Sequence, residues 1–100
     1  MDIARLERLA AGGFQILPLP GVSTHFAIER DGFVALAPRR EDDFGEPGAP
    51  GLLTEAGFAA MIWRGPEAWF VARGFERLAE VGEVEGIRRF DADLKQALAR

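Results

Sequence analysis

The chain carries the stretch THFAIERDGFVALAP at residues 24–38, and this stretch decides the fold. Two mostly apolar runs flank Asp31-Gly32, a residue pair that strongly favours a two-residue type I′ turn between antiparallel strands. A turn of this length fixes which residues face one another across the hairpin. The expected pairs are Arg30 with Phe33, Ile28 with Ala35, and Phe26 with Ala37, which leaves His25, Ala27 and Glu29 beside Val34 and Leu36 on the opposite face. Both faces of this hairpin therefore carry apolar side chains.

A second hairpin is predicted further along the chain, with strands at 58–64 and 68–73. The segment 65–67 reverses the chain, and because proline suits the first central position of a turn, we expect Pro66-Glu67 at the tip. This register puts Arg64 opposite Trp69 and Trp63 opposite Phe70. Both strands are almost wholly apolar, without the alternation of a sheet that has one wet face. A second surface of this hairpin must then be buried by the long loop, by a partner or by a second copy of the chain.

Both ends of the chain favour helices. From Asp2 to Ala11, apolar residues recur at helical spacing, with Asp2 as the N-cap. From Glu83 to Ala99, a second apolar stripe forms on one side of a longer helix. Gly86 is expected to weaken that helix by about 1 kcal/mol relative to alanine.

The remaining segments are less defined. Residues 14–19 are apolar and extended, but Pro18 limits them to an edge or a brief strand. The conformation of the loop at 39–57 is left open, with a small strand at Leu52–Thr54 or a short helix around 52–60 as alternatives. The segment 75–81 has no clean period and is compatible with one helical turn.

These elements predict an α+β fold in a single domain covering residues 1–100. Short turns join the sequential strands, so the sheet is expected to be antiparallel, with about four to six strands from two hairpins. The N-terminal and C-terminal helices are expected to pack on one face of this sheet. The element order resembles that of small dimeric α+β modules such as the roadblock-like and secretion-chaperone folds, and a likeness in fold does not transfer function.

Composition excludes several kinds of chemistry. The chain has no cysteine and one histidine, so disulfides, thiolate catalysis, Cys-based metal sites and sites with two imidazoles are ruled out. A net charge of −4 argues against a nucleic-acid partner. No apolar run approaches the roughly 18 residues of a membrane span. Arginine greatly exceeds lysine, which suggests a GC-rich coding sequence, and we expect a bacterial, cytoplasmic protein without membrane contact.

Two polar features are weighed for chemistry and set aside. His25 could move protons near neutral pH, but no orienting partner or metal-ligand spacing is readable around it. The acidic run at 41–43 with Glu46 lacks the alternating acids of a calcium loop, so it is interpreted as solvated loop. We therefore predict no catalytic residue, no metal and no cofactor.

The aromatic and arginine side chains of the second hairpin are the remaining candidates. Aromatic faces beside guanidinium groups could stack on and pair with a flat or anionic ligand. The same residue types also fill cores and protein interfaces. The ligand or interface candidates are His25, Trp63, Arg64, Trp69 and Arg73.

Three functions follow from this reading. The first is a non-enzymatic homodimeric interaction module, because large exposed apolar patches are uncommon in monomers and two-fold association is the commonest way to bury them. A further protein partner is compatible with it. The alternative is a small-ligand binding module that uses the aromatic and arginine face of the second hairpin. A small enzyme using His25 with Glu29 or Asp43 ranks third.

Overall fold

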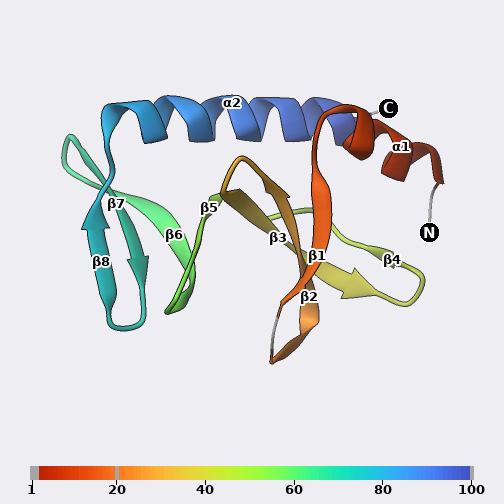
Figure 1. The fold of residues 1–100 in the computed structure, drawn as a ribbon, viewed down its shortest axis with the longest axis horizontal. Helices are drawn as coiled ribbons and strands as arrows, with labels where there is room; N and C mark the ends of the chain where they lie inside the picture. The colour runs from red at the N-terminus through yellow and green to blue at the C-terminus, as the bar shows by residue number, and fades with distance from the viewer. Residues whose placement is uncertain (1–2, 20, 100) are drawn as a thin grey trace.

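The computed structural model describes residues 3–19 and 21–99 of the chain. It is an α+β fold with an antiparallel sheet and two helices (Figure 1). In chain order the elements are α1 (Ile3–Ala11), β1 (Gln15–Leu19), β2 (Val22–Arg30), β3 (Phe33–Arg40), β4 (Asp43–Phe44), β5 (Gly51–Thr54), β6 (Gly57–Arg64), β7 (Glu67–Ala72), β8 (Phe75–Leu78) and α2 (Val81–Leu98).

The first hairpin, β2–β3, forms as the sequence predicts. Asp31 and Gly32 occupy its turn with φ of 55° and 88°, the two positive values that a type I′ turn requires. Ile28 pairs with Ala35 and Ala27 pairs with Leu36, so the expected register and the expected faces are both confirmed.

The second hairpin, β6–β7, differs from the prediction in its turn. The tip is Gly65-Pro66, so Arg64 pairs with Glu67 and Trp63 with Ala68; the predicted Pro66-Glu67 tip is wrong. The physical reason is Gly65, whose φ of 62° gives a positive first central residue, as in the primed turns that match the twist of paired strands. Because the register moves by two residues, every side chain keeps its predicted face.

The described part of the chain has eight strands, so four to six was an undercount. One missed strand is β4, where Asp43–Phe44 pairs with the end of β3 and Phe44 is buried. Another is β8, which pairs with β7 across a turn at Gly74, so this segment is a strand and not the helical turn that its sequence also allows. At Leu52–Thr54, the strand alternative is correct and becomes most of β5.

The sheet consists of two groups of strands joined at a narrow contact. Its order is β1-β2-β3-β5-β6-β7-β8, with β4 on the side of β3. Only two residue pairs, Phe33 with Leu52 and Val34 with Gly51, connect β3 to β5. We call β1–β4 the first lobe and β5–β8 the second lobe; Figure 1 shows both lying beneath α2.

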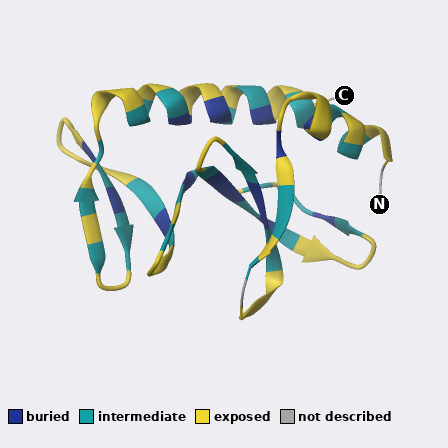
Figure 2. Cartoon of the chain, viewed as in Figure 1, coloured by how far each residue is buried: buried dark blue, intermediate teal, exposed yellow. Residues whose placement is uncertain are grey.

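The long helix α2 covers the inner side of both lobes. Glu80 is its N-cap, and a capping box joins Glu80 to Glu83. Its buried residues are Ile87, Phe90 and Leu94, and the buried parts of α2 lie on the side that faces the strands (Figure 2). The apolar stripe predicted for this helix is therefore confirmed.

The shorter helix α1 packs against the C-terminal half of α2. Leu9 of α1 enters the same core cluster as Phe90 and Leu94 of α2, and Arg8 donates a hydrogen bond of 2.8 Å to the carbonyl oxygen of Ala97. Asp2, the predicted N-cap, lies outside the described residues. That both helices lie on one face of the sheet stays a prediction.

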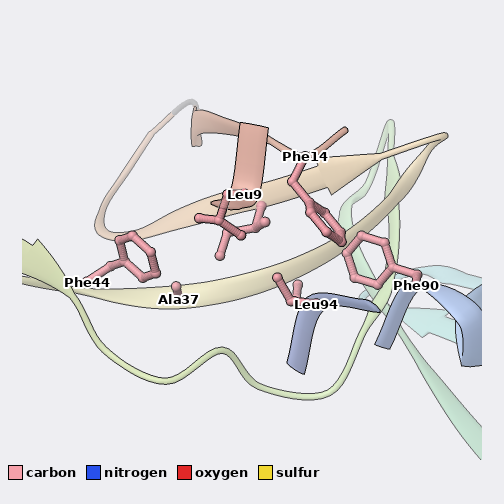
Figure 3. Packing of buried hydrophobic residues seen from close by; sticks show 8 residues of the cluster. Leu9, Phe14, Ala37, Phe44, Phe90 and Leu94 are labelled. Carbon is pink, nitrogen blue, oxygen red and sulfur yellow. The ribbon is translucent and has the colours of Figure 1, made fainter. Parts of the chain in front are cut away.

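Each lobe has its own cluster of buried side chains. The first-lobe cluster (Figure 3) contains Leu9, Phe14, Ile28, Ala35, Ala37, Phe44, Phe90 and Leu94. The second-lobe cluster is smaller and contains Ala59, Phe70 and Ile87. Phe33 packs against both clusters, and Gly86 lies directly against its ring, where an added Cβ would come within 2.7 Å. Gly86 is thus a packing requirement as well as a weak helix former.

Candidate functional site

The pairing of the strands defines two faces of the sheet. Ile28, Ala35, Ala59 and Phe70 lie on the face that packs against the buried residues of α2, which we call the inner face. Side chains alternate along each strand, so their neighbours lie on the opposite, outer face. The five candidates from the sequence divide between these faces and two lobes, and only Arg64 and Trp69 come together.

Trp63 lies on the inner face, in the second lobe. It pairs with Ala68 and is 51% exposed, because α2 begins beside it without covering it. The indole lines a groove of about 390 Å³ with Leu78 of β8 and with Val81 and Val84 at the start of α2. The charged residues Glu67, Glu85 and Arg88 also line this open groove.

Arg64 and Trp69 lie on the outer face of the second lobe. The guanidinium carbon of Arg64 is 5.2 Å from the centre of the Trp69 ring, and its Nη2 lies 2.7 Å from Oε1 of Glu76. This hydrogen bond raises the pKa of Arg64 and lowers the pKa of Glu76. The arginine is therefore already paired within the chain, and an anionic ligand would have to displace Glu76.

A row of apolar side chains crosses the outer face of the second lobe. Ile62 pairs with Trp69, and Trp69 pairs with Leu78, so the three form one line across β6, β7 and β8, which we call the outer row. Ile62 is 38% and Leu78 is 45% exposed, and neither core cluster includes a member of the row. The indole Nε1 of Trp69 is buried without a hydrogen-bond partner among the described residues.

Arg73 and His25 lie apart from these side chains. Arg73 is exposed in the turn between β7 and β8. His25 is half-buried on the outer face of the first lobe, and its Nδ1 lies 2.9 Å from the hydroxyl oxygen of Thr24.

The carboxylates considered for chemistry with His25 have other partners. Glu29 accepts hydrogen bonds from Gln15 and from the backbone of Gly32, and Asp43 pairs with Arg5 at 3.4 Å. Among the described residues, no group of three or more potential ligands is arranged to hold a metal ion. Nor does any described helix have the length and hydropathy needed to cross a membrane.

A second groove lies between the two lobes on the outer side. Its volume is about 380 Å³, and it is lined by Leu19, Val22, His25, Leu36, Leu53, Thr54, Glu55, Gly57 and Phe58. Sequence reasoning singled out only His25 from this set. The others come from the two sides of the joint between β3 and β5, and nothing in their spacing along the chain indicates that they meet.

No protein-family model, curated protein or solved structure matches this chain.

Proposed function

We propose that the protein is a non-enzymatic interaction module that forms a homodimer by packing the outer rows of two copies against each other. The observation that carries the proposal is the outer row itself, Ile62, Trp69 and Leu78. The first and last of these are 38% and 45% exposed, while on the inner face of the same strands Ala59 and Phe70 pack against Ile87 of α2. Burying such a row against a second copy removes apolar surface from water, which is the main favourable term in association.

Pairing of the sheet edges is a less favourable way for two copies to meet. Two copies related by a two-fold axis could pair along their β8 edges. Paired residues must have their side chains on the same face of the sheet, so in every allowed register one residue lies opposite the same residue of the other copy. The two registers that use most of β8 place Glu76 opposite Glu76, or Arg77 opposite Arg77. Like charges directly opposite are destabilising. At the other edge, Pro18 of β1 removes a backbone donor.

The surroundings of His25 support a function without catalysis. A general base needs an orienting partner within hydrogen-bond reach. The ring contacts the hydroxyl of Thr24, and no hydrogen bond within the described residues joins it to Glu29, Asp43 or Glu55.

Light scattering across a concentration series tests the proposal. We expect a mass approaching twice the 10.9 kDa of one chain at high concentration. Ile62→Glu buries a charge in the contact and should raise the dissociation constant at least tenfold, about 1.4 kcal/mol. Ile3→Glu, at a 69% exposed position of α1, is the matched control and should leave the mass unchanged. A wild-type protein that stays monomeric throughout would refute the proposal.

A second candidate is a small-ligand binding module, and one observation favours it. Trp63 is half-exposed and lines a groove of about 390 Å³, within the range typical of small-molecule sites. Fragment screening by NMR tests it: fragments that shift the Trp63 indole resonance but leave that of Trp69 in place would support this function. A library without any such fragment would count against it.

A further inference from the structure

We propose that the groove between the two lobes is a binding site for a small amphiphile with an apolar body and a cationic end. It is separate from the outer row and from the groove at Trp63. The proposal does not rest on the homodimer, because the groove is complete within one chain.

The walls of the groove are apolar and come from both lobes. Leu19 and Val22, at the connection between β1 and β2, form one side with Leu36 of β3, and Leu53 and Phe58 form the other. A volume of about 380 Å³ lies within the usual range for small-molecule sites, which are mostly apolar with a few placed polar groups. An alkyl or aryl body of modest size therefore suits it.

The structure holds both sides of the groove in place before any ligand arrives. On the second lobe, the Thr54 hydroxyl donates a hydrogen bond of 2.8 Å to the carbonyl oxygen of Gly57 and accepts one of 3.1 Å from the amide of Ala56. On the first lobe, Leu36 pairs with Ala27, and both Ala27 and Val34 are fully buried. A preformed site loses less conformational freedom on binding.

The charge at the groove favours a cation. Glu55 is the one carboxylate in the lining, which contains no lysine or arginine, and it makes no ion pair or hydrogen bond with the described residues. The hydroxyl of Thr54 is used by the turn, and Nδ1 of His25 contacts Thr24. With a net charge of −4 for the whole chain, an ammonium end is attracted where a carboxylate end is repelled.

NMR titration with a matched pair of probes, octylammonium and octanoate, tests both parts of the proposal. The two share an alkyl chain and differ in the sign of the head group. At low salt we expect octylammonium to bind about two- to fivefold more tightly, with shifts concentrated at the groove residues, since one exposed charge contributes modestly. Glu55→Gln should reduce this preference, because it weakens the attraction of octylammonium and relieves the repulsion of octanoate.

Two leucines provide the matched test of location. Leu53 and Leu78 are each 45% exposed on the outer face, but only Leu53 lines this groove. Leu53→Ser should weaken octylammonium binding about fivefold or more through lost apolar contact, and Leu78→Ser should not change it. Amide spectra of both variants check that they fold. Equal effects of the two substitutions, shifts scattered over the surface, or tighter binding of octanoate would each overturn the proposal.

Discussion

The two lobes are built from similar hairpins but differ in how completely they are covered. Eight buried side chains form the first-lobe cluster, to which both helices contribute, whereas three form the second-lobe cluster, to which only α2 contributes. The exposed large hydrophobic side chains of the strands are correspondingly concentrated in the second lobe, at Leu53, Ile62, Trp63 and Leu78, with Val22 alone in the first. The first lobe therefore has the more completely covered core, whereas the second lobe leaves apolar side chains exposed and available for contact.

The largest expected effect comes from opening the first-lobe core. Phe90 is 1% exposed and contacts Phe14 edge-on, with ring centres 5.5 Å apart. Phe90→Ala should lower the free energy of unfolding by about 3–5 kcal/mol, and Ile87→Ala in the second lobe by about 2–5 kcal/mol. Chemical denaturation measures both. If Ile87→Ala cost clearly more than Phe90→Ala, the first lobe would not be the better-packed one.

The second largest effect on stability is expected at Gly51, where the two lobes join. A Cβ at this position would lie 2.0 Å from the backbone oxygen of Ala59, and a backbone atom cannot move away as a side-chain end can. Gly51→Ala should therefore destabilise the fold by about 3 kcal/mol, at the upper end for overpacking.

Gly48→Ala is the control for this joint. An added Cβ at Gly48 has its nearest neighbour 3.9 Å away, at the carbonyl oxygen of Leu36, and its φ is not positive. Its thermal unfolding midpoint should stay close to that of the wild type. Equal midpoints for Gly51→Ala and Gly48→Ala would show that the joint is looser than described.

A smaller effect is expected where α2 crosses from one lobe to the other. Alanine at Gly86 gains about 1 kcal/mol of helix propensity, but its Cβ meets the Phe33 ring at 2.7 Å. Overpacking costs about 1–3 kcal/mol, so the net effect of Gly86→Ala should lie between neutral and destabilising by about 2 kcal/mol. Thermal denaturation showing a clear gain in stability would mean that Phe33 moves freely and does not tie the lobes together.

The smallest effect concerns the ion pair that fixes the start of α2 to the second lobe. Arg77 donates two hydrogen bonds, of 2.8 and 2.7 Å, to the Glu83 carboxylate, and this lowers the pKa of Glu83. A lowered folded-state pKa stabilises the protein above the unfolded pKa of about 4.3, and this contribution is lost as the pH falls through the folded value.

The substitution Glu83→Gln measures that contribution. It should cost less than about 1 kcal/mol at neutral pH, because Arg77 is 41% exposed, and the difference from wild type should shrink in acid. Glu85→Gln, at a carboxylate without an ion pair in the described residues, should show no such pH-dependent difference. A cost for Glu83→Gln that is independent of pH would exclude the ion pair as its cause.

The predictable parts of the fold are those set by local chemistry. Asp31-Gly32 fixed the register of the first hairpin, and the apolar spacing around Phe90 identified the helix α2. The strand β8 was missed because its two charged residues interrupt the apolar pattern, and each pairs with a residue of another element, Glu76 with Arg64 of β6 and Arg77 with Glu83 of α2. The strand β4 was missed because two residues among acidic neighbours carry no periodic signal.

The candidate sites were harder to predict for a related reason. An apolar second hairpin indicated an uncovered surface, and Arg64 and Trp69 do lie together on it. The groove between the lobes depends on how β3 meets β5 through two residue pairs, a contact between segments that no turn connects. Leu36, Leu53 and Phe58 look like ordinary strand residues in the sequence, so their convergence follows only from the tertiary structure.

The central claim is that the outer row of the second lobe is the surface that becomes buried between two copies. Amide and methyl NMR spectra recorded from about 10 μM to about 1 mM protein test it directly, because this range spans affinities typical of weak dimers. The account predicts concentration-dependent shifts at Ile62, Trp69 and Leu78, with the first-lobe strands β1 and β2 unchanged. Spectra that do not change with concentration, or that change only in the first lobe, would contradict it.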